Sequence, residues 1–428
     1  MDFNLHFDNQ TYSDWLKLWL KESGGKQPEE FVKKLDRGVE LKPFYHYSEN
    51  KNPQYTSDTL HEIAVSEWVD LPEEKDEYVN AFILKALNSG ASGLYLNVYK
   101  QPNWELLLKE VGLEYIQTTI DFKTDFHKGY RSLEAFLSLT RNENSAKKVY
   151  VVLPWHGHQE VFSETLQEIQ TDFHGLLVDL AEPLEAGLPP GLVLALGLEI
   201  LNAIRQTKPQ MLQHTGFLTA TVGNTYQDLV FNRALKILVK AWIEKANIQI
   251  DNVYIHTRTG RMDMGSADVY NNLIRNSIKT LSAIISGTNS VTVLPYNYFK
   301  TSADSDALRW ARNQALIAIY ESKLTYYSDP VAGSYALESL TERFIDAALE
   351  YQNEIQQFKT LSDLFESSYY SDALSQARQT ILEEYKNGNK VMVGISKYRP
   401  TNEQVEELKK AFREGSPFEP FVIQNHLA

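Results

Sequence analysis

Short apolar runs recur along the first three hundred residues, and helical patterns separate them. Each run is rich in β-branched, aliphatic or aromatic residues, as expected of strands that are buried on both faces of a parallel sheet. Eight such strands alternating with helices predict an α/β fold, a (β/α)8 barrel of the TIM type. The runs lie at residues 61–68, 93–99, 114–122, 149–155, 175–180, 212–220, 252–257 and 290–296.

Two of the intervening helices have clear apolar stripes. The first follows the sixth run, and its stripe comprises Val230, Ala234, Ile237 and Ala241, widened by Leu235, Leu238 and Trp242. The second follows the seventh run, with Asp268 or Ser266 as the expected N-cap and Gly287 as the expected stop. We expect its core face to comprise Leu273, Ile274, Ile278, Leu281 and Ile285.

The two ends of the chain differ from this alternating region. Near the N-terminus, Ser13 or Asp14 is positioned to cap a short helix that ends at Gly24-Gly25, and its apolar stripe comprises Trp15, Leu16, Trp19 and Leu20. This stripe is expected either to pack on the chain's own body or to clasp a second subunit. Beyond residue 300 a stripe of Ala307, Ala311, Ala315 and Ile319, then amphipathic patterns over 336–386, predict helices. We therefore predict an N-terminal arm (1–50), the barrel (51–300) and a C-terminal helical region (301–428).

Composition narrows the classes of partner. The net charge of −14 argues against binding to nucleic acid, and it gives no general field that would attract an anionic thioester. The absence of cysteine excludes disulfides, thiolate zinc sites and cysteine nucleophiles. No run of eighteen apolar residues occurs, and the first ten residues do not resemble a secretory signal. We expect a cytoplasmic protein that does not enter a membrane.

The most specific motifs lie between Val253 and Thr341. They read D-x-Y-N-N, G-T-x-S, R-x-A-R-N and D-P-x-x-G-S-Y-x-x-E. This set resembles the substrate-binding barrel of the adenosylcobalamin-dependent mutases, methylmalonyl-CoA mutase most closely. The shared positions are Asp268, Tyr270, Asn271, Asn272, Gly287, Thr288, Ser290, Arg309, Ala311, Arg312, Asn313, Asp329, Pro330, Gly333, Ser334, Tyr335 and Glu338.

The resemblance extends to residues 38–47 and to residues 387–400, which resemble the segment that closes the barrel region of these mutases. Catalytic mutase chains continue from that segment into a cobalamin-binding domain. About thirty residues remain here, so we expect this chain to lack that domain.

The positions that carry chemistry in the family differ in this chain. The family has Y-H-x-Q-E-A-G after the fifth strand, where the Tyr-His pair faces the reacting acyl group, and this chain has AEPLEAG. Ala181 and Glu182 therefore occupy the Tyr-His positions, and a carboxylate would repel an anionic substrate in a low-dielectric cavity. Tyr254 falls where the family has an arginine for the substrate carboxylate, and one neutral donor does not replace a bidentate guanidinium.

We therefore expect no catalytic residue in this chain, with those three positions degenerate. Bulky Trp155, Tyr254 and Tyr296 at strand ends favour a filled barrel over one threaded by pantetheine. The resemblance leaves three residues that could still line the barrel, namely His256, Thr257 and Arg258.

Two histidine patterns suggest other chemistry. Asp125-Phe-His127-Lys-Gly129 approximates the cobalt-binding D-x-H-x-x-G, but its glycine comes one residue early. His156-Gly-His158 has the H-x-H spacing of barrel metallohydrolases, and a site could be completed by His214, His256 and Asp179. That superfamily has H-x-H on the first strand, not the fourth, and no acid–base pattern accompanies it here. We expect no metal and no cofactor on this chain.

The leading hypothesis is a non-catalytic small subunit of a heterodimeric methylmalonyl-CoA mutase. By this resemblance, a large partner would carry adenosylcobalamin and interconvert methylmalonyl-CoA and succinyl-CoA. The first alternative is a substrate-binding acyl-CoA mutase chain that works with a separately encoded cobalamin-binding subunit. The second is a homodimeric relative with a new ligand in its remodelled barrel; a homodimer is also expected to be possible for the isolated small subunit.

Overall fold

A computed structural model gives the architecture of the chain. It describes residues 11–46, 62–71, 76–123, 132–133, 135–136, 149–153, 175–248, 250, 252–299, 305–400, 408, 416 and 418–427.

The eight predicted strands form one closed parallel barrel, which confirms the predicted (β/α)8 class. Their order around the barrel follows the chain, and the last strand pairs with the first through Ser290 and Ala64. The strands are β3 (Ala64–Leu71), β4 (Gly93–Val98), β5 (Gln117–Phe122), β6 (Val149–Leu153), β7 (Gly175–Asp179), β8 (Thr215–Thr221), β9 (Ile255–Thr259) and β10 (Ser290–Thr292).

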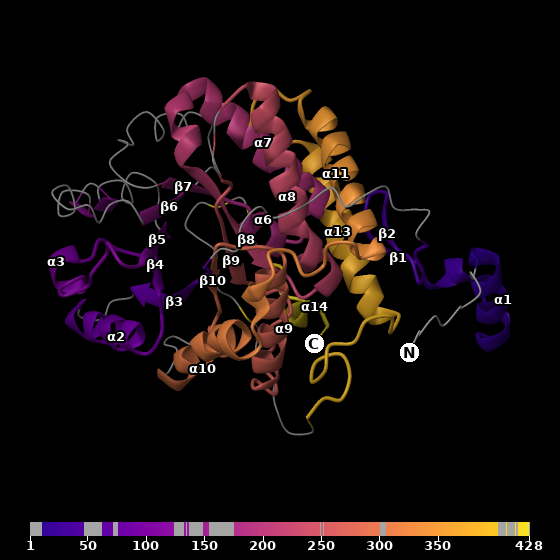
Figure 1. Cartoon of the computed structure of the whole chain (residues 1–428), viewed down its shortest axis with the longest axis horizontal. Helices are drawn as coiled ribbons and strands as arrows, with labels where there is room; N and C mark the ends of the chain where they lie inside the picture. The colour runs from indigo at the N-terminus through magenta and orange to yellow at the C-terminus, as the bar shows by residue number, and fades with distance from the viewer. Residues whose placement is uncertain are drawn as a thin grey trace, which may run out of the picture.

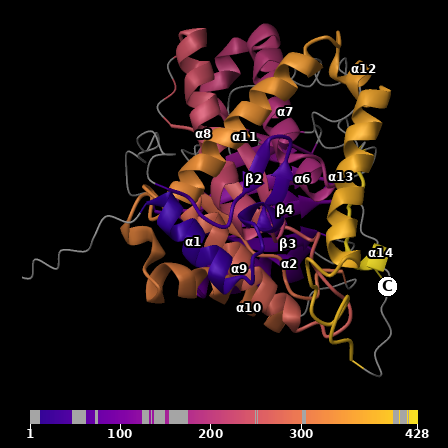
Figure 2. The same cartoon turned by 90° about the vertical axis from the view of Figure 1, so that its right-hand side faces the viewer.

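Helices surround the barrel, as Figure 1 and Figure 2 show. The most apolar helix, α7 (Pro190–Thr207), is continuously buried from Pro190 to Leu198, and α11 (Tyr335–Ile355) packs against it. The helices that follow the barrel strands are α2 (Asp76–Asn88), α3 (Trp104–Leu107), α6 (Ala181–Glu185), α7 (Pro190–Thr207), α8 (Thr225–Ala246), α9 (Asn271–Ile285) and α10 (Ser305–Leu316), with the 3-10 turn η4 (Pro209–His214) before β8.

The remaining C-terminal elements are helical, as the sequence predicts. They are the π-helical turn η5 (Ile317–Glu321), the 3-10 turn η6 (Leu324–Tyr326), α11 (Tyr335–Ile355), α12 (Leu361–Phe365), α13 (Ser368–Lys386) and α14 (Gln424–Leu427). Among the described residues, no helix combines the length and the apolar character needed to cross a bilayer.

The N-terminal helix α1 (Tyr12–Glu22) projects away from the barrel at the right of Figure 1, and none of its residues is buried. Its cap is Thr11, whose hydroxyl accepts from the Asp14 amide while the Asp14 carboxylate accepts from Thr11. The expected caps Ser13 and Asp14 are thus wrong, because Asp14 is the reciprocal partner in a capping box. A short 3-10 turn η1 (Pro28–Phe31) and the hairpin of β1 (Lys33–Asp36) and β2 (Val39–Leu41) connect this helix to the body.

Helix α9 has the opposite orientation to the predicted one. Ile274 and Ile278, expected in the core, are 65% and 47% exposed, whereas Asn272 and Asn276 are fully buried. The buried amides explain the inversion: Asn272 bonds Gly265 and the Tyr296 carbonyl, and Asn276 bonds the Leu294 carbonyl, so the polar side of the helix faces the barrel.

The expected caps of this helix are also wrong. Its N-cap is Tyr270, without a side-chain capping bond, and Asp268 has a left-handed backbone instead. Gly287 ends the helix as predicted, with a positive φ that suits glycine.

Candidate functional site

The carboxyl ends of the strands carry the candidate site, as in TIM barrels generally. After β7, Asp179 accepts hydrogen bonds from the backbone amides of Ala181 (2.9 Å) and Glu182 (3.1 Å) and so fixes the start of α6. Ala181 and Glu182, the positions of the family's Tyr-His pair, are fully buried there. Neither offers a phenol or an imidazole.

A buried ionic cluster lies beside α6. The Glu185 carboxylate pairs with Arg258 of β9, and it accepts from the Arg261 amide at 2.7 Å with the Arg261 guanidinium at 3.3 Å. Burial alone would raise the pKa of Glu185, but the two guanidinium groups hold it below its usual value. The cluster therefore keeps its charges, and Arg258 is engaged by the protein's own carboxylate.

A second buried group crosses from β4 to β5. The Tyr95 hydroxyl donates to Asp121 at 2.6 Å, and Lys123 pairs with the same carboxylate at 2.5 Å. Burial, then the neighbouring Asp121 charge, raises the pKa of Tyr95 well above its usual value, so this phenol stays protonated. No sequence motif pointed to this pair.

His256 lies inside the barrel wall, with both ring nitrogens hydrogen-bonded. Thr119 contacts Nδ1 and Thr292 contacts Nε2, each at 2.9 Å. The Thr292 hydroxyl donates its proton to the Ser66 carbonyl, so it accepts from Nε2–H, and Thr119 donates to Nδ1. Burial lowers the pKa of His256 to about 3, which keeps the ring neutral and leaves neither nitrogen free for a ligand.

The three residues expected to remain in the barrel lining do not share one face. His256 and Arg258 point inward, whereas Thr257 points outward and bonds Thr219 and Asn232. The expectation is therefore wrong for Thr257, because alternate residues of a strand face opposite sides.

Aromatic rings fill the interior. Trp68 stacks on Tyr95 with centroids 5.4 Å apart, and Tyr95 meets the edge of His256 at 5.3 Å. At the amino ends of the strands, Tyr150 stacks on Tyr254 at 3.9 Å. Within the described part of the chain, these rings lie in the centre of the barrel, where an extended pantetheine chain would have to pass.

Tyr254 thus lies at the opposite end of the barrel from Ala181 and Glu182. Its hydroxyl donates to Gln117 at 2.7 Å, next to the first residues of β5 and β9. The structure therefore does not bring the three degenerate positions together. Of the other bulky residues expected to fill the barrel, Tyr296 is buried after β10 but stacks on Trp310 of α10, and Trp155 lies outside the described residues.

The C-terminal segment, defined here as Ser416 and residues 418–427, covers the mouth on the β7 and β9 sides. The Phe421 amide donates to the Glu185 carbonyl, and the Ile423 amide donates to the Met262 carbonyl, each at 2.9 Å. Ser416 donates to the Glu182 carboxylate at 3.0 Å. Phe418, Phe421, Val422, Ile423 and Gln424 are all buried.

A corrin ring would have to displace this segment to approach α6. The residues that are present at the mouth therefore do not fit a bound adenosylcobalamin.

The metal hypothesis gains no support from geometry. His214 ends η4 before β8, at the amino end of the barrel, while Asp179 lies at the carboxyl end of β7. Both His156 and His158 fall outside the described residues, as does His127. Within the described part of the chain, no three His, Asp or Glu side chains are grouped as a metal site.

The retained motif residues hold the scaffold together. Asp329 and Glu338 of the D-P-x-x-G-S-Y-x-x-E motif each accept from Arg233 of α8 at 2.9 Å, and Thr341 accepts from the same guanidinium at 3.1 Å. Thr288 of the G-T-x-S motif donates toward carbonyls of β9 and β10.

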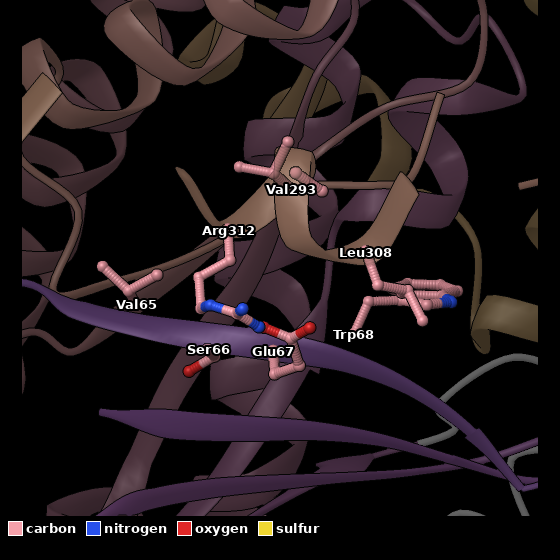
Figure 3. A pocket seen from close by; sticks show the side chains of 8 residues that line it. Val65, Ser66, Glu67, Trp68, Val293, Leu308 and Arg312 are labelled. Atoms are coloured by element: carbon pink, nitrogen blue, oxygen red, sulfur yellow. The ribbon is translucent and has the colours of Figure 1, made fainter. Parts of the chain in front are cut away.

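The R-x-A-R-N motif has a scaffold role as well. Arg312 of α10 pairs with buried Glu67 of β3 at 2.8 Å, as Figure 3 shows from close by. Leu308 lies near Trp68 in the same hollow, which has no space wide enough for a water molecule. Burial raises the pKa of Glu67 to about 7 even though Arg312 opposes the shift.

Comparisons with known proteins agree with these motifs. The family model for methylmalonyl-CoA mutase matches residues 208–414. Over this stretch, just under half of its length, the chain is similar to methylmalonyl-CoA mutases. Mitochondrial methylmalonyl-CoA mutase of Bos taurus is 22% identical over 493 residues, with 95% of this chain and 65% of the bovine chain covered.

Two bacterial relatives match over a shorter stretch. Methylmalonyl-CoA mutase of Rhizobium meliloti (strain 1021) is 28% identical over 149 residues, and that of Escherichia coli (strain K12) is 29% identical over 148 residues. Each match covers 35% of this chain and 21% of the relative. The chain thus spans less than two thirds of the length of these relatives.

Proposed function

We propose that this chain is a non-catalytic subunit of methylmalonyl-CoA mutase, whose isomerisation of methylmalonyl-CoA and succinyl-CoA takes place on a larger partner. The observation that carries the proposal is the filled barrel. Trp68, Tyr95 and His256 occupy the centre, and Tyr150 and Tyr254 stack at the amino end. A thioester bound inside the barrel would have to occupy the space that these side chains fill.

The polar groups of the barrel support the same conclusion. A radical rearrangement requires a protein site that binds the acyl group and excludes water. Here Arg258 is neutralised by Glu185, and His256 has both nitrogens bonded to threonine hydroxyls. These side chains are engaged by the protein's own groups and stabilise the barrel.

The partner in this proposal is a large mutase chain that carries adenosylcobalamin. The aromatic arm offers it a contact: Trp15 stacks on Phe44 at 4.3 Å, Trp19 packs edge-on against Phe31 at 5.1 Å, and α1 buries none of its residues in this chain. Trp and Tyr are favoured anchors of protein interfaces.

Co-expression tests the proposal directly. The tagged chain is produced together with the adenosylcobalamin-dependent mutase chain from the same genome, and the complex is isolated by affinity and gel filtration. We expect a stable complex with mutase activity that is unchanged by Glu182→Gln in this chain. Failure of the two chains to associate would contradict the proposal.

One observation favours the alternative of a substrate-binding chain. The Nη1 atom of Arg258 is buried without a hydrogen-bond partner among the described residues. An anionic acyl group could use it, provided that the rings around Tyr95 moved. This alternative requires the isolated chain to bind a CoA ester, whereas the non-catalytic subunit does not.

A further inference from the structure

The hairpin of β1 and β2 directs one carboxyl group toward the body of the protein. Asp36 ends β1, and Val39, its partner in β2, is fully buried. Strand β2 packs against α11, and Figure 1 shows the hairpin beside that helix. Because α1 and η1 directly precede the hairpin in the chain, its contacts attach the exposed N-terminal helix to the body.

Asp36 caps a helix of which it is not a part. The N-cap of α7 is Pro189, which makes no side-chain capping bond, and Pro190 at the first helical position has no amide hydrogen. Gly191 provides the next amide, which donates to Oδ2 of Asp36 at 2.5 Å. The first amides of a helix have no partner within the helix, so the hairpin completes the start of α7.

The close approach of three elements at this point requires glycine. A Cβ atom at position 191 would lie 3.0 Å from the Asp36 carboxylate and 3.0 Å from the Ala347 side chain of α11. Either neighbour would have to move to admit a larger residue. The hairpin, α7 and α11 therefore meet at Gly191.

The second oxygen of Asp36 is engaged as well. Oδ1 accepts from the Tyr351 hydroxyl of α11 at 3.2 Å and from the Arg37 amide at 2.7 Å. All three donors to the carboxyl group are neutral groups. Burial raises the pKa of Asp36 from 3.8 to about 6, although these hydrogen bonds oppose the shift.

The charged groups around Asp36 are engaged elsewhere or exposed. The Arg37 guanidinium pairs with Glu354 of α11 and lies 4.3 Å from the centroid of the Tyr351 ring, and Tyr369 of α13 donates to the same glutamate at 2.6 Å. The first turn of α7 has no charged residue. The other charged groups of the hairpin are exposed, namely Lys33, Lys34 and Glu40.

A protonated Asp36 would fit this environment better than an ionised one. The protonated carboxyl keeps one carbonyl oxygen to accept from Gly191, and its hydroxyl can donate to Tyr351. It also avoids the cost of holding a charge away from water. The docked hairpin therefore binds more protons than the detached one between pH 3.8 and about 6, so docking strengthens as the pH falls through this window and is weakest above it.

We propose that the hairpin of β1 and β2 is a proton-responsive clasp on the start of α7, which tightens when Asp36 takes up a proton and loosens when Asp36 is ionised. Because the clasp follows α1 and η1, acidification would restrict the motion of the N-terminal helix. The start of α7 lies five residues after Glu185 at the end of α6, so the same contact would steady the loop that leads from the mouth of the barrel.

Hydrogen exchange of the full chain tests the clasp, followed by mass spectrometry on peptides that cover residues 33–41 and 190–198. Protection is measured at pH 5 and pH 7.5 and corrected for the intrinsic pH dependence of exchange. With a pKa of about 6 when docked and 3.8 when detached, we expect the hairpin to be about tenfold more protected at pH 5. A peptide over β8 serves as the reference for changes in global stability.

Two variants assign the response to Asp36. Asp36→Asn cannot titrate, so the difference in protection between the two pH values should vanish. Tyr351→Phe removes a hydrogen bond that lowers the pKa of Asp36, so the midpoint of the response should move to higher pH. The matched control is Glu40→Gln, which replaces an exposed carboxylate of the same hairpin and should keep the wild-type response.

Equal protection of the wild-type hairpin at both pH values would overturn the proposal. A pH response that persists in Asp36→Asn would do the same, because another group would then control the hairpin. If Asp36→Asn does not fold, an unmoved midpoint in Tyr351→Phe would contradict the proposal in its place.

Discussion

At the residue scale, the interior of the barrel replaces ligand contacts with contacts between its own side chains. His256 shows this most clearly, because two threonine hydroxyls satisfy both ring nitrogens. Its sequence position suggests a barrel-lining residue, but only the structure shows that its neighbours saturate it. The partners come from β5 and β10, far away in the chain, so no local pattern could reveal them.

The buried His256 predicts a pH dependence of stability. Its pKa is about 3 in the folded protein and 6.5 without burial, so between these values the unfolded chain binds more protons. The free energy of unfolding should therefore fall as the pH drops from 6.5 toward 3. Urea titrations at pH 7 and pH 4 measure this fall.

His256→Gln should reduce that pH dependence, while costing about 2 kcal/mol at pH 7 through lost hydrogen bonds. The same replacement at exposed His214 provides the control. An unaltered pH dependence in His256→Gln would contradict the assignment of a buried neutral ring.

The Glu185 cluster predicts a larger loss of stability than His256→Gln causes, although Glu185→Gln changes the size of the side chain very little. Glu185→Gln leaves the Arg258 and Arg261 guanidinium groups buried without their carboxylate, which typically costs about 3–5 kcal/mol. Glu105→Gln, on the surface of α3, should change the free energy of unfolding little. Equal urea midpoints for the two variants would show that the cluster is not buried as described.

At the element scale, sequence patterns located the strands and helices but did not determine which way each helix faces. The periodicity of α9 correctly predicts an apolar stripe but places it on the wrong side of the helix. Asn272 and Asn276 occupy the side that faces the barrel because they donate hydrogen bonds to loop carbonyls. Such bonds depend on where distant loops lie. The covering of the mouth by residues 418–427 was likewise unpredicted, because its short segments carry no periodic signal.

The contacts between α8 and the D-P-x-x-G-S-Y-x-x-E motif predict that the stability of the protein depends on Arg233. This buried guanidinium joins α8 to the start of α11 through Asp329 and Glu338. Arg233→Met would leave two carboxylates unpaired and should lower the free energy of unfolding by about 3 kcal/mol or more. Arg309→Met, at an exposed pair with Asp306, should cost less than about 1 kcal/mol. Chemical denaturation of both variants makes the comparison.

The C-terminal segment is expected to contribute to the stability of the protein. Phe421 is buried on α6 and packs near Gly187, so Phe421→Ala should destabilise the protein by about 3–5 kcal/mol. Leu18→Ala on exposed α1 should have almost no effect in the isolated chain. Similar thermal midpoints for the two variants would contradict the packing of the C-terminal segment against the carboxyl ends of the barrel strands.

At the scale of the whole molecule, the chain keeps the mutase scaffold and closes its interior. The fold class followed from eight apolar runs and their spacing, and the family followed from motifs that the structure assigns to scaffold contacts. The filled axis could be anticipated only in part: Tyr254 was noticed, but the stack of Trp68 on Tyr95 depends on the register between β3 and β4.

The most direct test of this account is a calorimetric titration of the isolated chain with methylmalonyl-CoA. A barrel filled by Trp68, Tyr95, His256 and the Tyr150–Tyr254 stack predicts no saturable heat up to about 1 mM ligand, the range in which weak complexes become undetectable. Saturable binding with a micromolar Kd would show that a thioester enters the barrel, and would contradict the account.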